Sequence, residues 1–236
     1  MTERISTLHA EGLRFSYPGG EPVYDGFSLD AASNERVALT GPSGAGKTTL
    51  CQLLAGYIRP AEGKVWISDP DGTTMINGAR RELRRGRGRK VQDRNVRDSR
   101  TRSSLLRAAT PCPVQLIGQH PESALDPMMR MEASLKEAGD ADPYILEQLC
   151  IRHEWLRRYP HELSGGEMQR FCIARALLAK PRFIIADEIT TMLDAVSQSL
   201  VWHVLLEYAA ENNAGIVFVT HSESLRSRIA TRSIEV

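Results

Sequence analysis

Two continuous apolar segments in the second half of the chain restrict the fold most. "RFIIAD" (182–187) and "GIVFVT" (215–220) carry apolar side chains at successive positions rather than at alternate ones. Strands of this composition are buried on both faces, as in parallel sheets. The segment between them, "AVSQSLVWHVLLEYAAEN" (195–212), has the composition and length of a helix. Strand, helix and strand in this order form a β–α–β unit, so we expect an α/β fold with a mostly parallel sheet.

The rest of the chain supplies further predicted elements. The first forty residues read as short strands separated by turn residues. "KTTLCQLLAG" (47–56) is predicted to be a helix ended by Gly56, because glycine commonly follows the last helical residue. The other predicted elements are strands at 8–17, 26–31, 35–40 and 63–68, an apolar run at 113–119, and helical segments at 126–139, 142–151 and 167–180.

Residues 69–110 interrupt this order. They are rich in glycine, aspartate, serine and arginine without a sustained hydrophobic period, which favours a long, loop-like insertion. Within them, residues 80–107 hold 12 Lys or Arg against 3 Asp or Glu, a net charge of +9 in a chain whose total is +1. We interpret this stretch as a solvated basic insertion, with contact to anionic lipid headgroups as the main alternative.

The composition excludes several classes of protein. No apolar stretch approaches the roughly 18 residues that a membrane-spanning helix needs. The N-terminus "MTERISTLHAEG" is too charged for a secretory signal. The four cysteines are widely spaced without a C-x-x-C pair, so we expect reduced thiols. With 236 residues and 42% hydrophobic composition, residues 1–236 can bury one core and are predicted to form a single domain.

"GPSGAGKT" (Gly41 to Thr48) matches the pattern G-x-x-x-x-G-K-[ST], with a predicted strand before it and a predicted helix after it. Glycines at these positions let backbone N–H groups wrap phosphates. Lys47 is expected to reach the β- and γ-phosphate oxygens, and the Thr48 hydroxyl to ligate Mg²⁺. The predicted phosphate-contacting set is Gly41, Pro42, Ser43, Gly44, Ala45, Gly46, Lys47, Thr48 and Thr49.

Polar side chains also follow the two buried strands. "RFIIADE" delivers Asp187 and Glu188 at the carboxyl end of its strand, and "GIVFVTH" delivers His221 at the end of the next. Because α/β sheets bind ligands at the carboxyl ends of their strands, these side chains are expected to converge. We expect Asp187 to hold Mg²⁺ and Glu188 to polarise an attacking water. His221 is expected to lie near the γ-phosphate.

A second phosphate-binding device lies more than a hundred residues after the first. In "RYPHELSGGEMQR" (158–170), Ser164 and Glu167 have the spacing of a capping box, and Gly165 and Gly166 leave the first backbone N–H groups of the helix uncovered. Such a helix start suits an anion.

Together, "GPSGAGKT", "LSGGEMQR", "IIADE" and "VTH" resemble, in order and spacing, the nucleotide-binding subunit of an ABC transporter. The resemblance covers nearly the whole chain except about residues 69–110. It implies a P-loop NTPase core with a mostly parallel sheet, an N-terminal antiparallel β subdomain, and a small helical subdomain at about 120–180 that carries the signature "LSGG". It implies ATP and Mg²⁺ as cofactors, and ATP hydrolysis coupled to transport.

The resemblance also assigns the second device. In that family two ATPase subunits pair head to tail, and the signature of one closes over ATP held by the other. The signature set implied here is Leu163, Ser164, Gly165, Gly166, Glu167 and Gln169. Two devices would then lie far apart because they serve two different nucleotides.

Further roles are carried over from the family. Tyr17 in "FSYPGG" matches the aromatic that stacks on adenine, and Leu193 and Asp194 match the loop that crosses between subunits. Gln119 matches the glutamine that touches Mg²⁺ and reports to the membrane subunit. Gln92 is a rival, but no apolar strand precedes it. Glu188, His221, Lys47 and Gln119 form the predicted catalytic set.

The chain departs from the family pattern at a few positions. Ile189 replaces the usual proline after the acidic pair, and "TTMLD" replaces S-A-L-D in the loop that the resemblance implies crosses between subunits. Asn34 replaces a turn glycine, a benign change because asparagine tolerates positive φ. None of these departures removes a catalytic group.

"QHPESALDP" and "YPHELSGGEMQR" are similar to the peptide and nickel importer branch. That branch implies a second ATPase subunit, two membrane permease subunits, a substrate-binding protein, and a cytoplasmic position on the inner face of the cell membrane. The implied cargo is a peptide, nickel or another metal, or a metal chelate. We expect no large regulatory domain after His221.

Two other functions remain open. A non-transport ABC ATPase could act on nucleic acid or ribosomes through residues 80–107, since basic runs bind phosphate backbones. That stretch has no aromatic residue for base stacking, so no nucleic acid is expected as a partner. A phosphate-loop kinase of small substrates would leave "LSGGEMQR" unexplained.

Overall fold

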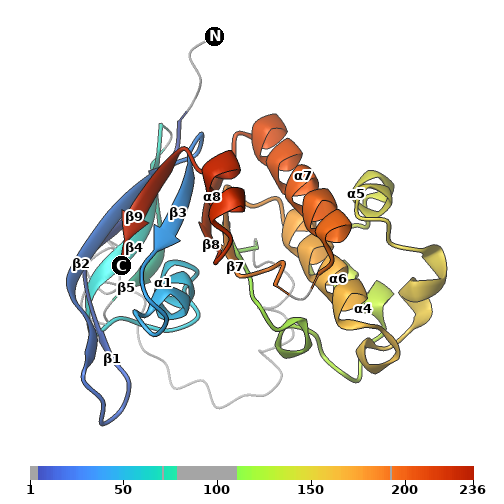
Figure 1. The fold of residues 1–236 in the computed structure, drawn as a ribbon, viewed down its shortest axis with the longest axis horizontal. Helices are drawn as coiled ribbons and strands as arrows, with labels where there is room; N and C mark the ends of the chain where they lie inside the picture. Colours follow the sequence, from blue (N-terminus) through green and yellow to red (C-terminus); the bar gives the residue numbers. More distant parts are fainter. Residues whose placement is uncertain (1–4, 71, 79–110, 192) are drawn as a thin grey trace, which may run out of the picture.

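The computed structural model describes residues 5–70, 72–78, 111–191 and 193–236, which form two β-sheets with helices between and beside them (Figure 1). One sheet has four antiparallel strands in the order β2–β1–β4–β5. The other has five parallel strands in the order β6–β7–β8–β3–β9. The strands are β1 (Thr7–Ser16), β2 (Pro22–Ala32), β3 (Arg36–Thr40), β4 (Glu62–Asp69), β5 (Gly72–Gly78), β6 (Val114–Ile117), β7 (Phe183–Asp187), β8 (Gly215–Val219) and β9 (Arg232–Glu235).

The central strands of the parallel sheet contribute side chains to two separate hydrophobic clusters, one on each face of the sheet. In β7, Phe183 and Ile185 belong to one hydrophobic cluster, whereas Ile184 and Ala186 belong to the other. All four are fully buried because both faces of the sheet are covered. This is why the sequence is continuously apolar here rather than alternating.

The first cluster lies between the two sheets. It joins β1, β2 and β4 to helix α1 (Lys47–Leu54), which fills the space between the antiparallel and parallel sheets (Figure 1). The second cluster lies on the opposite face of the parallel sheet, under α6 (Gly165–Leu178) and α7 (Ala195–Asn212). Helices α1 and α6 therefore lie on opposite faces of the same sheet.

The segment between β6 and β7 contains helices and no strand. Its elements are η1 (Pro121–Ser123), α4 (Met131–Lys136), α5 (Pro143–Gln148), η2 (His153–Arg157), η3 (Pro160–Glu162) and α6. The predicted helices in this segment are confirmed in type, although α4 and α5 are shorter than the sequence pattern indicated. The chain then passes through β7, α7, β8 and α8 (Glu223–Ile229) to β9, an edge strand that was not predicted.

The prediction of a loop from residue 69 was wrong for residues 72–78. They form β5, which pairs with β4 at the edge of the antiparallel sheet. The buried amide of Asn77 anchors this strand, because it donates to the carbonyls of Leu53 in α1 and of Ile58 in the loop that follows. Residues 79–110, with the basic run at 80–107 and Gln92, lie outside the described residues.

Two further expectations concern the described residues. None of the described helices is long and apolar enough to span a bilayer. All four cysteines are described, and each is a free thiol, as the sequence predicted.

Candidate active site

The phosphate loop connects β3 to α1 and depends on its glycines. Gly44 and Gly46 adopt φ angles of 83° and 98°, which favour glycine strongly. A Cβ atom at Gly46 would also lie 2.6 Å from the Val23 side chain, so no larger residue fits there. Lys47, which begins α1, is buried and donates from Nζ to the carbonyls of Gly41 at 2.9 Å and Pro42 at 2.7 Å. The loop thus keeps a lysine ammonium and a helix N-terminus in one concave turn, as an anion site requires.

Asp187 lies behind this loop at the end of β7. Its side chain is buried, and desolvation raises the pKa of its carboxyl above the ordinary aspartate value, with the charge of Glu188 adding to the rise. A hydrogen bond from the Thr48 hydroxyl and the charge of Lys47 oppose that rise. A hydrogen bond therefore joins Thr48 and Asp187, the two residues that are predicted to ligate Mg²⁺.

The Asp187 Oδ1 atom is buried and makes no hydrogen bond in the described part of the chain. Buried polar atoms normally have a partner, so an unpaired carboxylate oxygen calls for one. A carboxylate and a hydroxyl are hard oxygen donors of the kind that Mg²⁺ prefers. The residues present therefore fit a Mg²⁺ ion.

Glu188 and His221 meet beside Asp187. Glu188 Oε1 lies 2.7 Å from His221 Nε2. Glu188 adopts a φ of 50°, a left-handed conformation that is uncommon for residues other than glycine and that often marks functional positions. Its backbone N–H donates to the Val219 carbonyl of β8 at 3.2 Å, which holds the turn in place. The result is a partly buried carboxylate, 16% exposed, oriented by an imidazole and able to accept a proton from water.

Tyr17 follows β1 and reaches the start of α1. Its hydroxyl lies 3.1 Å from the Thr49 Oγ1 atom, and its ring packs edge-to-face against Phe15. Tyr17 is 49% exposed beside the phosphate loop. An exposed, anchored aromatic ring here suits the face of a purine.

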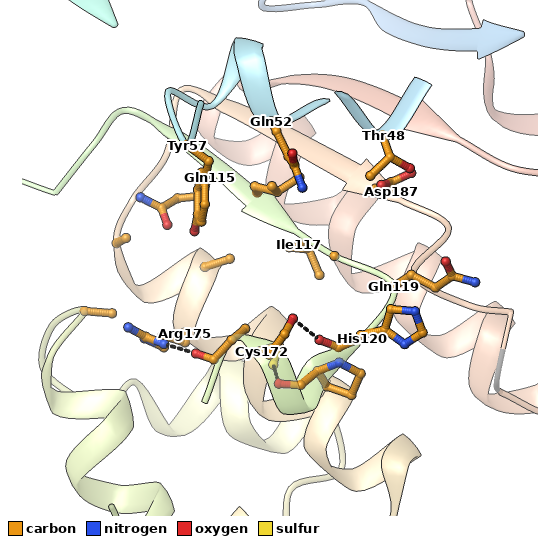
Figure 2. A pocket seen from close by; sticks show the side chains of 18 of the residues that line it. Thr48, Gln52, Tyr57, Gln115, Ile117, Gln119, His120, Cys172, Arg175 and Asp187 are labelled. Carbon is orange, nitrogen blue, oxygen red and sulfur yellow. Dashed lines mark hydrogen bonds between the residues drawn. The ribbon is translucent and has the colours of Figure 1, made fainter. Parts of the chain in front are cut away.

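Gln119 lies in the loop that leaves β6. It lines a cavity of about 570 Å³ together with Thr48 and Asp187, which lie toward the same end of the cavity (Figure 2). The structure thus brings the third expected Mg²⁺ residue to the edge of the site. At the other end, Tyr57 and Gln115 line the same cavity.

Ser164 begins α6 with the predicted capping box. Its backbone N–H donates to Glu167 Oε2 at 2.7 Å, while its Oγ accepts from the Glu167 N–H at 3.3 Å. The hydrogen bond from the Ser164 backbone, opposed by slight burial, lowers the pKa of Glu167. Ser164 and Gly165 are exposed, and a Cβ at Gly165 would meet no atom within 4 Å. The uncovered helix start therefore faces open space.

Two members of the predicted signature set lie inside the protein. Leu163 and Gln169 are buried, at 8% and 3% exposure, because both side chains point into the protein under α6. Gln169 Nε2 instead donates to the Gly118 carbonyl at 3.2 Å. Their assignment to the signature stays a prediction, and neither side chain lies on the surface.

The loop before α7 is built around Asp194. Its carboxylate accepts from the N–H groups of Val196 and Ser197, each at 3.0 Å, and these bonds lower its pKa. Leu193 packs close to the signature, since a Cβ at Gly166 would lie 3.1 Å from its Cδ2. The side chain of Asp194 is used as the cap of its own helix, while Met192 lies outside the described residues.

Sequence reasoning missed two residues that hold the loop after β6. Cys172 and Arg175 of α6 donate to the carbonyls of Pro121 and Ala124 (Figure 2). Their positions on α6 follow helical periodicity, but only the tertiary fold reveals which loop they face.

Comparison with known proteins agrees with this geometry. The family model described as ABC transporter matches residues 24–191. The chain is 33% identical over 228 residues to the lipoprotein-releasing system ATP-binding protein LolD of Xanthomonas campestris pv. campestris, covering 96% of this chain and 85% of that protein. It is 29% identical over 240 residues to the nickel import system ATP-binding protein NikE of Staphylococcus aureus, with the same coverage.

Solved structures show the same fold. The dimeric structure of MJ0796, a bacterial ABC transporter cassette, matches with a TM-score of 0.70 at 21% identity, covering 97% of this chain and 94% of that one. The structure of cbiO1 from Clostridium perfringens, described as part of the ABC transporter complex cbiONQ, matches with a TM-score of 0.65 at 22% identity, covering 97% of this chain and 83% of that one. The predicted fold class, a nucleotide-binding core with a parallel sheet and an additional antiparallel sheet, is confirmed.

Proposed function

Since this chain belongs to the ABC transporter family of ATP-binding subunits, which are ATPases, we propose that it pairs head to tail with a second such subunit. Each composite site would join the phosphate loop of one subunit to the signature of the other. The observation that carries this proposal is the position of α1 and α6 on opposite faces of the parallel sheet. A solved cassette of similar fold is described as a dimer, which agrees with it.

In the proposed site, each residue has a separate task. The phosphate loop and Lys47 hold the β- and γ-phosphates, and the side chain of the exposed Tyr17 packs against adenine. Thr48, Asp187 and Gln119 would hold Mg²⁺, which neutralises charge on the phosphates when bound.

Hydrolysis is assigned to Glu188. Its carboxylate polarises the attacking water and takes up the proton, while His221 keeps that carboxylate oriented and lies beside the γ-phosphate. The helix start at Ser164–Gly166, exposed at Ser164 and Gly165, supplies the backbone N–H groups of Gly165 and Gly166 to the γ-phosphate of the partner's nucleotide.

The variant Glu188→Gln tests this assignment, because glutamine keeps the size of the side chain but cannot take up the proton. With Mg²⁺ and ATP, the variant should bind nucleotide, hydrolyse it at under about one-hundredth of the wild-type rate, and shift to a dimer in analytical ultracentrifugation. Wild-type turnover, or a monomer that is saturated with ATP, would contradict the proposal.

For the wider assembly, we propose two permease subunits and a substrate-binding protein, with this subunit at the inner face of the cell membrane. We propose import of a peptide, nickel or another metal, or a metal chelate. The motifs "QHPESALDP" and "YPHELSGGEMQR" and the relative named for nickel import support this direction. The relative at 33% identity is named for lipoprotein release, which makes release of a lipoprotein the second candidate.

Deleting the gene separates these two candidates. Loss of radiolabelled nickel or peptide uptake with normal lipoprotein localisation supports import, and the reverse result supports release. If the protein instead acts on nucleic acid through residues 80–107, it should bind RNA or DNA in a salt-sensitive way. Deleting this segment should then abolish that binding and leave the rate of ATP hydrolysis unchanged.

A further inference from the structure

Helix α6 is fastened to the loop after β6 by three side chains at regular spacing. Gln169 donates to the Gly118 carbonyl at 3.2 Å. Cys172 donates to the Pro121 carbonyl at 3.7 Å, and Arg175 donates to the Ala124 carbonyl at 2.7 Å. Donors and acceptors both advance by three residues, so the helix and the loop run in the same direction and in register.

Residues three apart on a helix lie on one face, which explains why one side of α6 can serve the whole loop. Figure 2 shows two of these three bonds, those from Cys172 and from Arg175. The third bond, from Gln169, lies next to Gln119. The loop that carries Gln119 is therefore attached to the helix that begins with the signature.

Gln169 is the unusual member of this set. Its side chain is 3% exposed, and its Oε1 atom is buried without a hydrogen-bond partner among the described residues. A buried amide that is only half satisfied is unfavourable for folding compared with an apolar side chain of similar shape. Stability therefore does not explain a glutamine here, whereas its single bond to Gly118 does connect two functional segments.

We propose that Gln169 is a positioning residue that transmits the state of the Ser164–Gly166 helix start to Gln119. This inference rests on the proposed function, in which Ser164–Gly166 contacts the partner's nucleotide and Gln119 contacts this chain's own site. A nucleotide closing on α6 from the partner subunit would move the Gly118–Gln119 segment with the helix. One composite site would thereby adjust the magnesium-side glutamine of the other.

The variant Gln169→Met tests the inference, because methionine keeps the length of the side chain and removes both polar atoms. We expect the melting temperature of this variant to be unchanged or higher, and its ATP affinity to lie within about twofold of wild type. Its kcat should fall about five- to tenfold, the loss expected for one hydrogen bond. The matched control is Asn212→Leu. It removes an amide bond to the Tyr208 carbonyl at the end of α7, outside the lining of the cavity, and should leave kcat unchanged.

A double variant separates transmission from local disturbance. Gln119→Ala should lower kcat by itself, and adding Gln169→Met should then have little further effect, because both changes interrupt one connection. Multiplying effects would overturn the inference, as would wild-type kcat in Gln169→Met. If Gln119→Ala leaves kcat unchanged, the role proposed for Gln119 is itself wrong and the inference falls with it. If Gln119→Ala lowers kcat but Gln169→Met does not, the inference about Gln169 is overturned while the role proposed for Gln119 stands.

Discussion

His221 Nε2 lies 2.7 Å from Glu188 Oε1, and this contact joins the ends of two neighbouring parallel strands. The strand register pairs Asp187 with Val219, which places Glu188 and His221 just beyond the last paired residues. The geometry therefore depends on the β7–β8 pairing, and the orientation of the carboxylate depends on the imidazole.

The variant His221→Ala removes that imidazole while leaving the phosphate loop intact. We expect kcat to fall about 100-fold, because Glu188 loses the imidazole that orients it and a positioned general base contributes about 100-fold or more, with ATP affinity nearly unchanged. Steady-state ATPase assays and equilibrium binding of labelled ATP provide the two measurements. His203→Ala, an exposed histidine on α7, is the control and should behave as wild type. Equal losses in both variants would argue against a specific role for His221.

The buried carboxylate of Asp187 is proposed to bind Mg²⁺, and its burial lowers the stability of the folded protein. Because burial raises the pKa of its carboxyl, the folded state binds a proton more readily than the unfolded state does. The charged form is therefore destabilising above the folded-state pKa, and stability from this group increases as the pH falls through it. Asp187→Asn should raise the melting temperature of the nucleotide-free protein at neutral pH and abolish Mg²⁺-dependent hydrolysis.

In a protein of this length, the melting temperature should rise by about 2–4 °C for each kcal/mol of destabilisation that Asp187→Asn removes. The difference between Asp187→Asn and wild type should shrink toward acidic pH, as differential scanning calorimetry at several pH values can show. A lower melting temperature for the variant at neutral pH would mean that the Asp187 carboxylate stabilises the fold, against this account.

Lys47→Ala removes the ammonium that the phosphate loop encloses. A hydrogen bond to a charged group is worth about 1.5–3 kcal/mol, so the Kd for ATP should rise about tenfold or more. Isothermal titration calorimetry measures it directly. Lys136→Ala serves as control, since that side chain pairs with Glu132 on an exposed helix face. An unchanged Kd for Lys47→Ala would remove the phosphate role from this loop.

Local sequence signals predicted the central elements of the fold better than its edges. The buried strands and the capping box rest on local signals, continuous apolar runs and the Ser164–Glu167 spacing, and these are confirmed. Strand β5 was missed because its sequence, "GTTMING", has few apolar residues, and only Asn77 and Gly78 are buried. The burial of Gln169 was missed because its partner, the Gly118 carbonyl, lies 51 residues away in the chain. Local pattern cannot report such a contact.

The head-to-tail arrangement is tested most directly by mixing two inactive variants. Ser164→Arg should leave ATP binding by the isolated subunit nearly intact, because the phosphate loop and Tyr17 lie on the α1 side of the sheet. Hydrolysis should collapse, since the substitution destroys the capping box and places a bulky cation at the helix start.

In a pair of Ser164→Arg with Lys47→Ala, one composite site contains both changes and the other contains neither. ATPase activity should therefore reappear on mixing, in proportion to the fraction of mixed pairs measured by cross-linking or fluorescence energy transfer. Mixed pairs that form but stay inactive would contradict a shared site. Loss of ATP binding by the Ser164→Arg monomer would place the signature in the pocket of its own chain.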